Sequence, residues 1–275
     1  MMKSRPSRVL AKLRQGAIPT IAKINLSDPR VVEIAGLCGA DGVWLCNEHV
    51  PNDWIGLENQ IRAARVRDID TIVRVSRGSY SDYLRPLEAD ATGIMVPHVS
   101  TADEARQIVE WVRCHPLGKR ALDGGNTDGL FCMLPIEDYV RQINTERIIV
   151  LQIESPEAVE NLDAIAAVPG YDVLLFGPGD FSHRIGKAGK FDDPQVVEAR
   201  KRVAAAARKH GKFAMTAGLI APFNDLVAEG YQVFNVGADV VGLAGYFKQR
   251  LELLANHIAA LPASARFAPK SSPYA

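Results

Sequence analysis

Hydrophobic positions along the chain gather in eight short runs that are rich in β-branched side chains. Most of these runs are continuous rather than alternating, which is typical of strands buried on both faces of a parallel sheet. The pattern therefore predicts eight parallel strands. They are expected at Pro19–Ile24, Gly42–Cys46, Thr71–Val75, Gly93–Val96, Ile148–Ile153, Val173–Phe176, Phe213–Thr216 and Val233–Val236.

Stretches with helical periodicity and helix-capping residues separate the runs. Pro29–Cys38 carries an apolar face, and Thr101–Val112 opens with a capping threonine followed by two acids. Pro156–Val168 starts with proline at the first helical position, and Pro194–Gly211 ends on basic residues before glycine. Eight strand–helix units in about 260 residues favour the α/β class and a single (β/α)8 TIM barrel over a doubly wound sheet.

The two ends and one long gap stand outside this repeat. Val9, Leu10 and Leu13 fit one face of a short, basic, amino-terminal helix that we expect to cap a barrel spanning 1–261. Residues 262–275 are rich in Pro, Ser and Ala and are expected to form a flexible tail. The gap from Arg113 to Arg147 contains four glycines and is expected to be a functional or mobile loop.

Composition removes several classes of protein. The 275 residues carry 32 basic and 32 acidic side chains, which argues against nucleic acid as the main partner. No apolar run approaches the length of a membrane span, so no membrane partner is expected. The four scattered cysteines form no CxxC pair, which favours a cytoplasmic protein with reduced thiols over a disulfide scaffold or a zinc ribbon.

Two acids stand at the ends of nearly apolar runs, where a barrel would build its active site. Glu154 closes the fifth run, and Asp180 follows the sixth after Gly177-Pro178-Gly179. Carboxylates there must be paired or must bind a cation, and oxygen ligands from neighbouring strands suit Mg²⁺ or Mn²⁺. The alternative is a pair of acids in structural ion pairs.

Other strand-end residues suggest acid–base and anion-binding chemistry. His49 follows the second run and is a candidate general base, with a structural histidine as the alternative. Arg74 ends the third run and could hold a substrate carboxylate or enolate oxygen, or form an internal salt bridge. His98 and His183 lie in strand-end loops from which they could touch substrate, whereas His115 and His210 are expected to be exposed.

Taken together, these residues resemble the metal-dependent pyruvate aldolases of the HpcH/HpaI type, which include 4-hydroxy-2-oxoheptanedioate and 2-keto-3-deoxy-sugar-acid aldolases. The resemblance runs from about Leu13 to His257. The motifs that carry it are Glu48-His49-Val50-Pro51-Asn52, Val73-Arg74, Met95-Val96-Pro97, Gln152-Ile153-Glu154, Gly177-Pro178-Gly179-Asp180-Phe181-Ser182 and, more weakly, Val236-Gly237-Ala238-Asp239.

The resemblance implies a phosphoenolpyruvate/pyruvate-type barrel that cleaves or forms 4-hydroxy-2-oxo acids through a pyruvate enolate, with an aldehyde as the second small-molecule partner. It implies that Glu154 and Asp180 bind Mg²⁺ or Mn²⁺, with Co²⁺ as a further possibility. The family also assembles as hexamers with sites near subunit boundaries, so we expect a homo-oligomer.

The resemblance also gives roles to individual residues. It makes His49 the base and Arg74 the group that steadies the enolate, and it brings Gln152, Gly179 and Asp180 to the oxo-acid. The acid matching Glu88 raises the basicity of the histidine in the family, where it is usually Asp.

Two departures from the family weaken parts of this picture. The family often has Asp three residues before the histidine, where this chain has Cys46, and Asn47 replaces a common Gly. Glu48 or Glu88 could compensate for the missing carboxylate. The loop from Asp123 to Gly129 also differs, and that loop usually helps to choose the aldehyde.

Two other functions stay open from the sequence. One is a lyase of the same fold that acts on an acyl-CoA thioester or decarboxylates an oxo-acid, although no strong basic cluster marks a CoA-binding mouth. The other is a non-catalytic metabolite-binding barrel, which only the Cys46 change favours.

Overall fold

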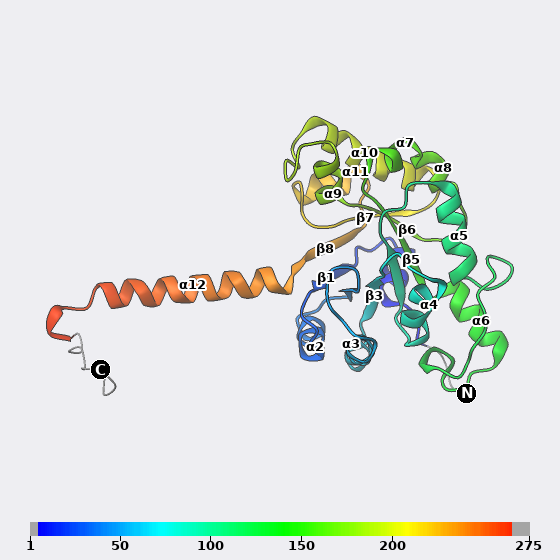
Figure 1. Ribbon diagram of the computed structural model, residues 1–275, viewed down its shortest axis with the longest axis horizontal. Coiled ribbons are helices and arrows are strands. Elements are labelled where there is room, and N and C mark those ends of the chain that lie inside the picture. Colours follow the sequence, from blue (N-terminus) through cyan, green and yellow to red (C-terminus); the bar gives the residue numbers. More distant parts are fainter. Residues whose placement is uncertain (1–4, 266–275) are drawn as a thin grey trace.

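The computed structural model describes residues 5–265 and contains a closed barrel of eight parallel strands in chain order (Figure 1). Each strand pairs with its neighbours in sequence, and β8 closes the ring on β1. The predicted α/β class and TIM barrel are therefore confirmed. The strands are β1 (Thr20–Ile24), β2 (Gly42–Cys46), β3 (Asp70–Arg74), β4 (Gly93–Val96), β5 (Ile148–Ile153), β6 (Val173–Phe176), β7 (Phe213–Thr216) and β8 (Val233–Ala238).

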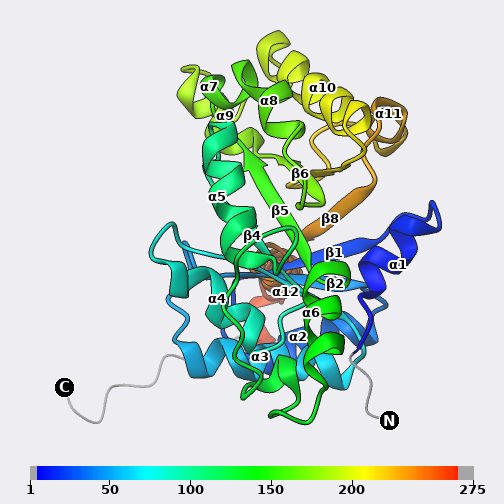
Figure 2. The same cartoon turned by 90° about the vertical axis from the view of Figure 1, so that its right-hand side faces the viewer.

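Helices surround the strands, and α12 is seen end-on behind them in Figure 2. The segment predicted as one helix over Pro156–Val168 is two short helices joined at Asn161. The helices are α1 (Arg8–Arg14), α2 (Pro29–Leu37), α3 (Trp54–Val66), α4 (Tyr80–Glu88), α5 (Ala102–Val112), α6 (Ile136–Thr145), α7 (Pro156–Glu160), α8 (Leu162–Ala166), α9 (Pro178–Arg184), α10 (Pro194–Lys209), α11 (Phe223–Glu229) and α12 (Asp239–Ala259), with 3-10 turns η1 (Thr127–Gly129) and η2 (Ala263–Ala265).

Side chains of alternating direction along each strand build two separate apolar layers. The larger layer fills the space between the strands and the outer helices. The smaller layer fills the barrel and is joined by Val9, Leu10 and Leu13 of α1. Its members from the strands are Ile21, Trp44, Ile72, Met95, Ile148, Val150, Val173, Leu175, Met215 and Val233.

The long gap between β4 and β5 is more structured than the sequence suggests. Its second half forms α6, which buries Tyr139, Gln142 and Ile143. Its first half is held by a fully buried ion pair between Arg120 and Asp128, joined by the Tyr139 hydroxyl. The prediction of a loop over the whole gap was wrong, because the glycines before α6 hid a short amphipathic pattern that follows them.

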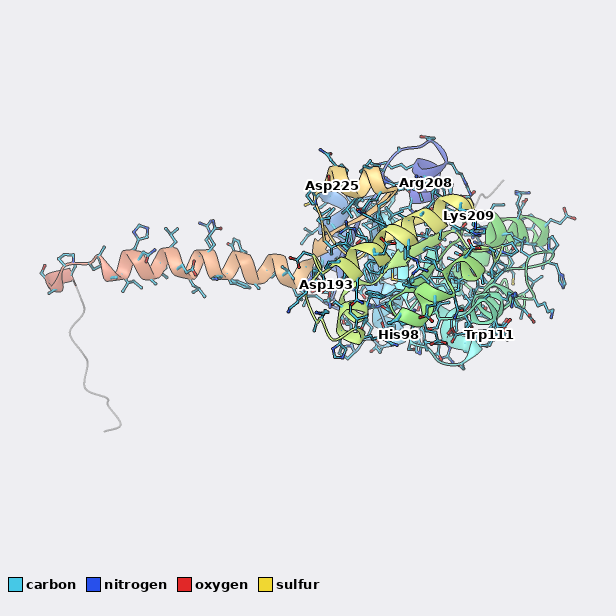
Figure 3. The ribbon with its side chains drawn as sticks, turned by 90° about the horizontal axis from the view of Figure 1, so that it is seen from above. His98, Trp111, Asp193, Arg208, Lys209 and Asp225 are labelled. Carbon is cyan, nitrogen blue, oxygen red and sulfur yellow. The ribbon has the colours of Figure 1, made fainter. Side chains whose placement is uncertain are left out.

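Helix α12 leaves the barrel and extends away from it (Figures 1 and 3). None of its residues is buried, and its main contacts are with β1 and β8. Along one side of α12 lie apolar residues at helical spacing, which we call the apolar stripe. The stripe consists of Val240, Leu243, Phe247, Leu251, Leu254 and Ile258. Within residues 5–265, no helix combines the length and the apolar character needed to cross a membrane.

Candidate active site

The inward-facing positions of several strands end in polar side chains at the carboxyl end of the barrel. In β1, β2 and β3 the inner-layer residues Ile21, Trp44 and Ile72 are each followed two positions later by a polar residue. In β5, Ile148 and Val150 are continued in the same way, so that the parity of the strand keeps the next side chains facing inward. We call this set the polar ring. It consists of Lys23, Cys46, Arg74, Gln152 and Glu154.

Glu154 is a buried carboxylate, and the exposed carboxylate of Asp180 lies near it. The Glu154 side chain is only 1% exposed; Oε1 accepts a hydrogen bond of 2.7 Å from the backbone of His98, and Oε2 accepts one from Gln152. Burial raises the pKa of Glu154, and the charge of Asp180 acts in the same direction, although the contacts with His98 and Gln152 oppose it. Binding of a proton or a cation therefore stabilises this carboxylate.

The surroundings of Glu154 fit a divalent metal. Gln152 Oε1 is buried and has no hydrogen-bond partner within the described residues, so an unused oxygen donor lies beside the carboxylate. A side chain at Gly177 would place its Cβ 2.6 Å from Glu154 Oε2, so glycine leaves room for that oxygen. Across residues 5–265, no three His, Cys, Asp or Glu side chains enclose a metal by themselves. Two carboxylates with a shell left open to water and substrate suit Mg²⁺ or Mn²⁺.

Glu48 connects the two sides of the site. Its Oε2 lies 3.0 Å from Nε of Arg74, and its Oε1 lies 3.2 Å from Nε2 of His98. The other nitrogen of His98, Nδ1, lies 2.9 Å from Glu154 Oε1. The two ring nitrogens of His98 therefore lie between two carboxylates, and a neutral imidazole can donate to only one of them at a time. Backbone geometry fixes that ring, because His98 has a left-handed φ of 55° and its carbonyl accepts a hydrogen bond of 2.7 Å from Arg77.

Arg74 is held on three sides at the floor of the site. Its Nη2 donates to Cys46 Sγ at 3.1 Å, its Nε faces Glu48, and its guanidinium carbon lies 5.0 Å from the centre of the Trp44 ring. Burial raises the pKa of the Cys46 thiol, but the Arg74 charge and hydrogen bonds from Arg74 and the His49 backbone outweigh it, so the pKa falls below its usual range. Cys46 and Arg74 therefore stabilise each other's charge.

The remaining predicted residues lie in different surroundings. The His49 ring is 62% exposed at the mouth of the barrel, with Nε2 3.4 Å from Glu48 Oε2. Cys46 accepts from the His49 backbone and does not pair with the ring. Gly179 is exposed in the first turn of α9, and His183 is exposed near the end of that helix.

Among the described residues Glu88 makes no hydrogen bond or ion pair with His49 and lines a different part of the surface. It ends α4 and lines a hollow of about 460 Å³ together with Trp54, Arg85 and residues of the loop before α6. Burial raises the pKa of Glu88, with the Asp128 charge acting in the same direction and the Arg120 charge opposing it. A role for Glu88 beside the histidine stays a prediction.

Two residues are more central to the site than the sequence predicts. The sequence suggests Glu48 only as a substitute for the missing Asp, and His98 only as a loop residue that could touch substrate. Both nevertheless bridge other members of the site. The adjacent Glu48-His49 pair was the available signal for Glu48, whereas no local pattern predicts the left-handed backbone that turns His98 inward.

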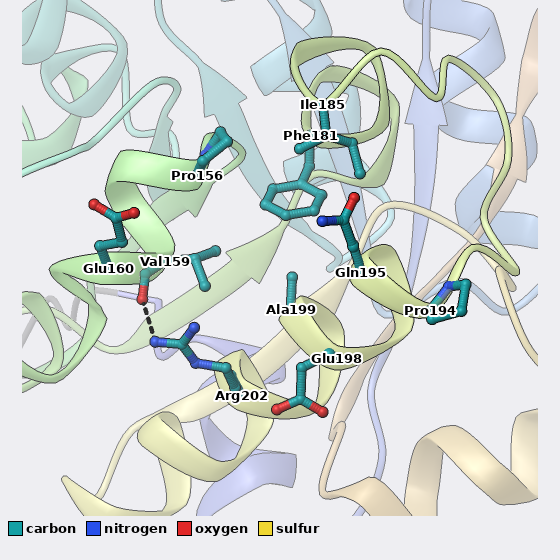
Figure 4. Close-up of a pocket in the computed structure, with 10 residues that line it drawn as sticks. All are labelled: Pro156, Val159, Glu160, Phe181, Ile185, Pro194, Gln195, Glu198, Ala199 and Arg202. Carbon is teal, nitrogen blue, oxygen red and sulfur yellow. Dashed lines mark hydrogen bonds between the residues drawn. The ribbon is translucent and has the colours of Figure 1, made fainter.

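A separate hollow of about 390 Å³ lies outside the barrel between α7, α9 and α10 (Figure 4). Phe181 and Pro156 line it, and across it Arg202 donates a hydrogen bond of 2.7 Å to the Val159 carbonyl. Phe181 follows Asp180 by one position, and Pro156 follows Glu154 by two. Neither acid lines the hollow, so it is distinct from the polar ring.

The raised pKa of Glu154 predicts a stability difference that depends on pH. Its contribution is fully present below about pH 4.5, the unfolded value, and is lost as the pH rises through the folded value. Glu154→Gln should therefore melt at a higher temperature than wild type near neutral pH in metal-free buffer, with the difference vanishing in acid. Thermal melts across this range measure the effect. A wild type that gains on the variant as the pH rises would contradict it.

Comparison with known proteins agrees with this geometry. Residues 23–244 match the family model described as HpcH/HpaI aldolase/citrate lyase. A 5-keto-4-deoxy-D-glucarate aldolase from Klebsiella pneumoniae subsp. pneumoniae is 33% identical over 254 residues, which cover 91% of this chain and 96% of that protein.

Solved structures are also similar to this chain. An HpcH/HpaI aldolase from Desulfitobacterium hafniense DCB-2 superposes with a TM-score of 0.84 at 28% identity, covering 95% of this chain and 99% of the other. The citrate synthase SbnG has a TM-score of 0.82 at 27% identity, covering 90% and 97%. The chain belongs to the HpcH/HpaI aldolase/citrate lyase family, and its activity is that of a metal-dependent class II aldolase, a carbon–carbon lyase.

Proposed function

We propose that this chain cleaves or forms a 4-hydroxy-2-oxo acid, with pyruvate as the oxo-acid and Mg²⁺ or Mn²⁺ held by Glu154 and Asp180. The observation that carries the proposal is the buried Glu154 carboxylate beside the unpartnered oxygen of Gln152. An aldolase of this kind must stabilise negative charge on an enolate oxygen, and a cation at that position does so. Relatives named 5-keto-4-deoxy-D-glucarate aldolase make a keto-deoxy sugar diacid the first substrate to assay.

The residues of the chain divide the reaction between them. In cleavage, His49 takes the proton of the C4 hydroxyl, the C3–C4 bond breaks, and its electron pair passes into the pyruvate enolate while the aldehyde leaves. Arg74 stabilises the enolate oxygen with its guanidinium, which Glu48 and Cys46 hold in place. Gln152 and the backbone at Gly179 orient the oxo-acid. The metal, when bound, supplies a Lewis acid for the oxo group.

Exchange of the pyruvate methyl protons for deuterium tests the proposal without knowledge of the aldehyde. Proton NMR should show loss of the methyl signal that requires enzyme and Mg²⁺, Mn²⁺ or Co²⁺, and that stops when a chelator is added. An acyl-CoA lyase or a metabolite-binding barrel would leave the methyl group of pyruvate unchanged. Absence of exchange with all three metals would overturn the proposal.

The exposed stripe of α12 supports a homo-oligomer. The helices that flank the place where an eighth barrel helix would lie are α11 and α2, and both leave apolar side chains exposed toward solvent. These are Phe223, Val227, Ile34 and Leu37. In our proposal the apolar stripe of one copy covers this surface on a second copy, because both surfaces lose apolar area to water in doing so.

A charge placed in the apolar stripe should break this assembly. Leu251→Glu is expected to shift the molar mass, measured by light scattering after gel filtration, from an oligomer to a monomer. Gln249→Glu adds the same charge on the opposite side of α12 and should leave the mass unchanged. The wild-type mass also separates a dimer from the hexamer that the family resemblance implies. A monomeric wild type would contradict the proposal.

We also propose a cytoplasmic location. The structure leaves Cys38, Cys46, Cys114 and Cys132 as free thiols. Free thiols persist in reducing compartments and are uncommon in secreted domains. Fractionation of the native cell tests the location, and recovery with exported proteins would contradict it.

A further inference from the structure

Lys23 is a charged side chain inside the barrel that the proposed reaction does not use. It follows Ile21 by two positions on β1, so the strand directs both side chains inward. The backbone of Lys23 lies opposite Trp44 of β2, and its Nζ is 5.1 Å from the centre of the Trp44 ring. The Arg74 guanidinium also lies over the Trp44 ring, so two cations contact the same aromatic side chain.

The Lys23 ammonium has no anion of its own. Among the described residues it forms neither an ion pair nor a hydrogen bond, whereas Arg74 has both Glu48 and Cys46. Cys46, Asp239 and Glu48 face Lys23 at longer range. The Asp239 carboxylate accepts hydrogen bonds from the backbone of Asn25 and Leu26 at 2.8 and 2.9 Å, whereas Glu48 and Cys46 contact Arg74. A half-buried ammonium beside a second cation is stabilised by an anion from outside the chain.

The position of Lys23 in the ring indicates which anion this is. In a closed barrel of eight strands in chain order, β1 lies opposite β5. Glu154 follows β5 and Asp180 follows β6, so the proposed metal and the oxo-acid end of the substrate belong to the side away from Lys23. A substrate that extends across the mouth therefore presents its aldehyde-derived end to β1.

We propose that Lys23 binds a carboxylate on the aldehyde-derived end of the substrate and so selects dicarboxylic 4-hydroxy-2-oxo acids over neutral-ended ones. The inference rests on the proposed function, since it assumes that pyruvate occupies the Glu154 side. Lys23 is a specificity-determining residue in this scheme and takes no part in enolate formation. Burial and the charge of Arg74 lower the pKa of Lys23, and a bound carboxylate offsets both effects.

Condensation with two acceptor aldehydes of similar size tests the inference. Glyoxylate carries a carboxylate and glycolaldehyde does not, and both are offered with pyruvate. In Lys23→Met the KM for glyoxylate should rise by at least about tenfold, because a charge-assisted hydrogen bond is lost. The KM for glycolaldehyde should stay within about twofold of wild type, because no charged contact is removed there.

Three controls keep the result interpretable. Lys23→Arg retains the charge and should recover most of the affinity for glyoxylate, provided that thermal melts show both variants folded. Lys212→Met removes another half-buried lysine, one that lies over Tyr171 and donates to its carbonyl at the other end of the barrel, and it should change neither KM. Deuterium exchange into pyruvate alone should proceed in Lys23→Met as in wild type.

The outcomes separate the two proposals. If wild type shows no pyruvate exchange, the proposed function fails, whatever Lys23 does. If exchange is intact and Lys23→Met treats both aldehydes as wild type does, the inference about Lys23 is overturned. It is overturned also if borohydride reduction with pyruvate attaches a mass to Lys23, because the amine would then form an imine with the oxo-acid, or if Lys23→Met abolishes exchange.

Discussion

Glu154→Gln and Asp180→Asn should each lower metal-dependent exchange of the pyruvate methyl protons by at least about a hundredfold, because a metal Lewis acid contributes several kcal/mol to enolate formation. Each change removes a negative charge while keeping the size of the side chain. Glu154 is held by the His98 backbone and by Gln152, and an amide oxygen can accept the same bonds. The barrel should therefore fold in both variants.

Calorimetric titration with Mn²⁺ links the loss of activity to the metal. Both variants should bind Mn²⁺ more weakly than wild type, and at higher Mn²⁺ part of the exchange should return. Glu157→Gln removes an exposed acid from the first turn of α7 and is the matched control, with binding and exchange unchanged. Wild-type exchange rates in either variant under chelating conditions would show that the two acids are not the metal site.

The strands could be predicted well because a parallel barrel buries both faces of each strand. Five of the eight predicted runs agree with the structure at both ends, and β1, β3 and β8 differ by a few residues at their limits. The same burial allowed Glu154 to be predicted as a site residue, because an acid that follows six apolar or uncharged strand positions is costly to bury. Strand parity then directs Arg74 and Glu154 inward, which is why local sequence was informative about part of the site.

Contacts between distant segments could not be read in the same way. Glu48, in the loop after β2, contacts Arg74 at the end of β3 and His98 in the loop after β4, and neither contact follows from spacing along the chain. In the sequence Cys46 stands where an acid near His49 is expected, but the barrel register sets it opposite Arg74. The strand register, rather than proximity in sequence, determines which side chain contacts a substituted residue such as Cys46.

The position of helix α12 could not be predicted from its sequence pattern. Its apolar stripe has the spacing of a helix that covers a barrel, and the predicted barrel domain of residues 1–261 includes it. The stripe specifies a partner surface of a given shape and polarity but not the chain that provides it. Only the three-dimensional course of the chain shows that α12 turns away from its own barrel (Figure 1).

Arg74 is the protein group that we propose stabilises the enolate, and this role would depend on geometry as well as charge. One edge of the guanidinium is fixed by Nη2 on Cys46 and another by Nε beside Glu48, while the flat face lies on Trp44. Nη1 has no partner among the described residues and is free to meet a substrate oxygen. A lysine ammonium could occupy only one of these positions at a time.

Arg74→Lys should therefore lower kcat by at least about tenfold, because removal of one oxyanion donor typically costs about 3 kcal/mol. The loss should fall on kcat more than on KM, since charge on the enolate oxygen develops only as the C3–C4 bond breaks. Arg67→Lys, which weakens an ion pair with Glu33 on the surface, serves as the control and should match wild type. Steady-state kinetics of cleavage, together with the rate of pyruvate exchange, measures both variants. If Arg74→Lys turns over like wild type, the enolate is stabilised by the metal alone and Arg74 serves only to hold Glu48.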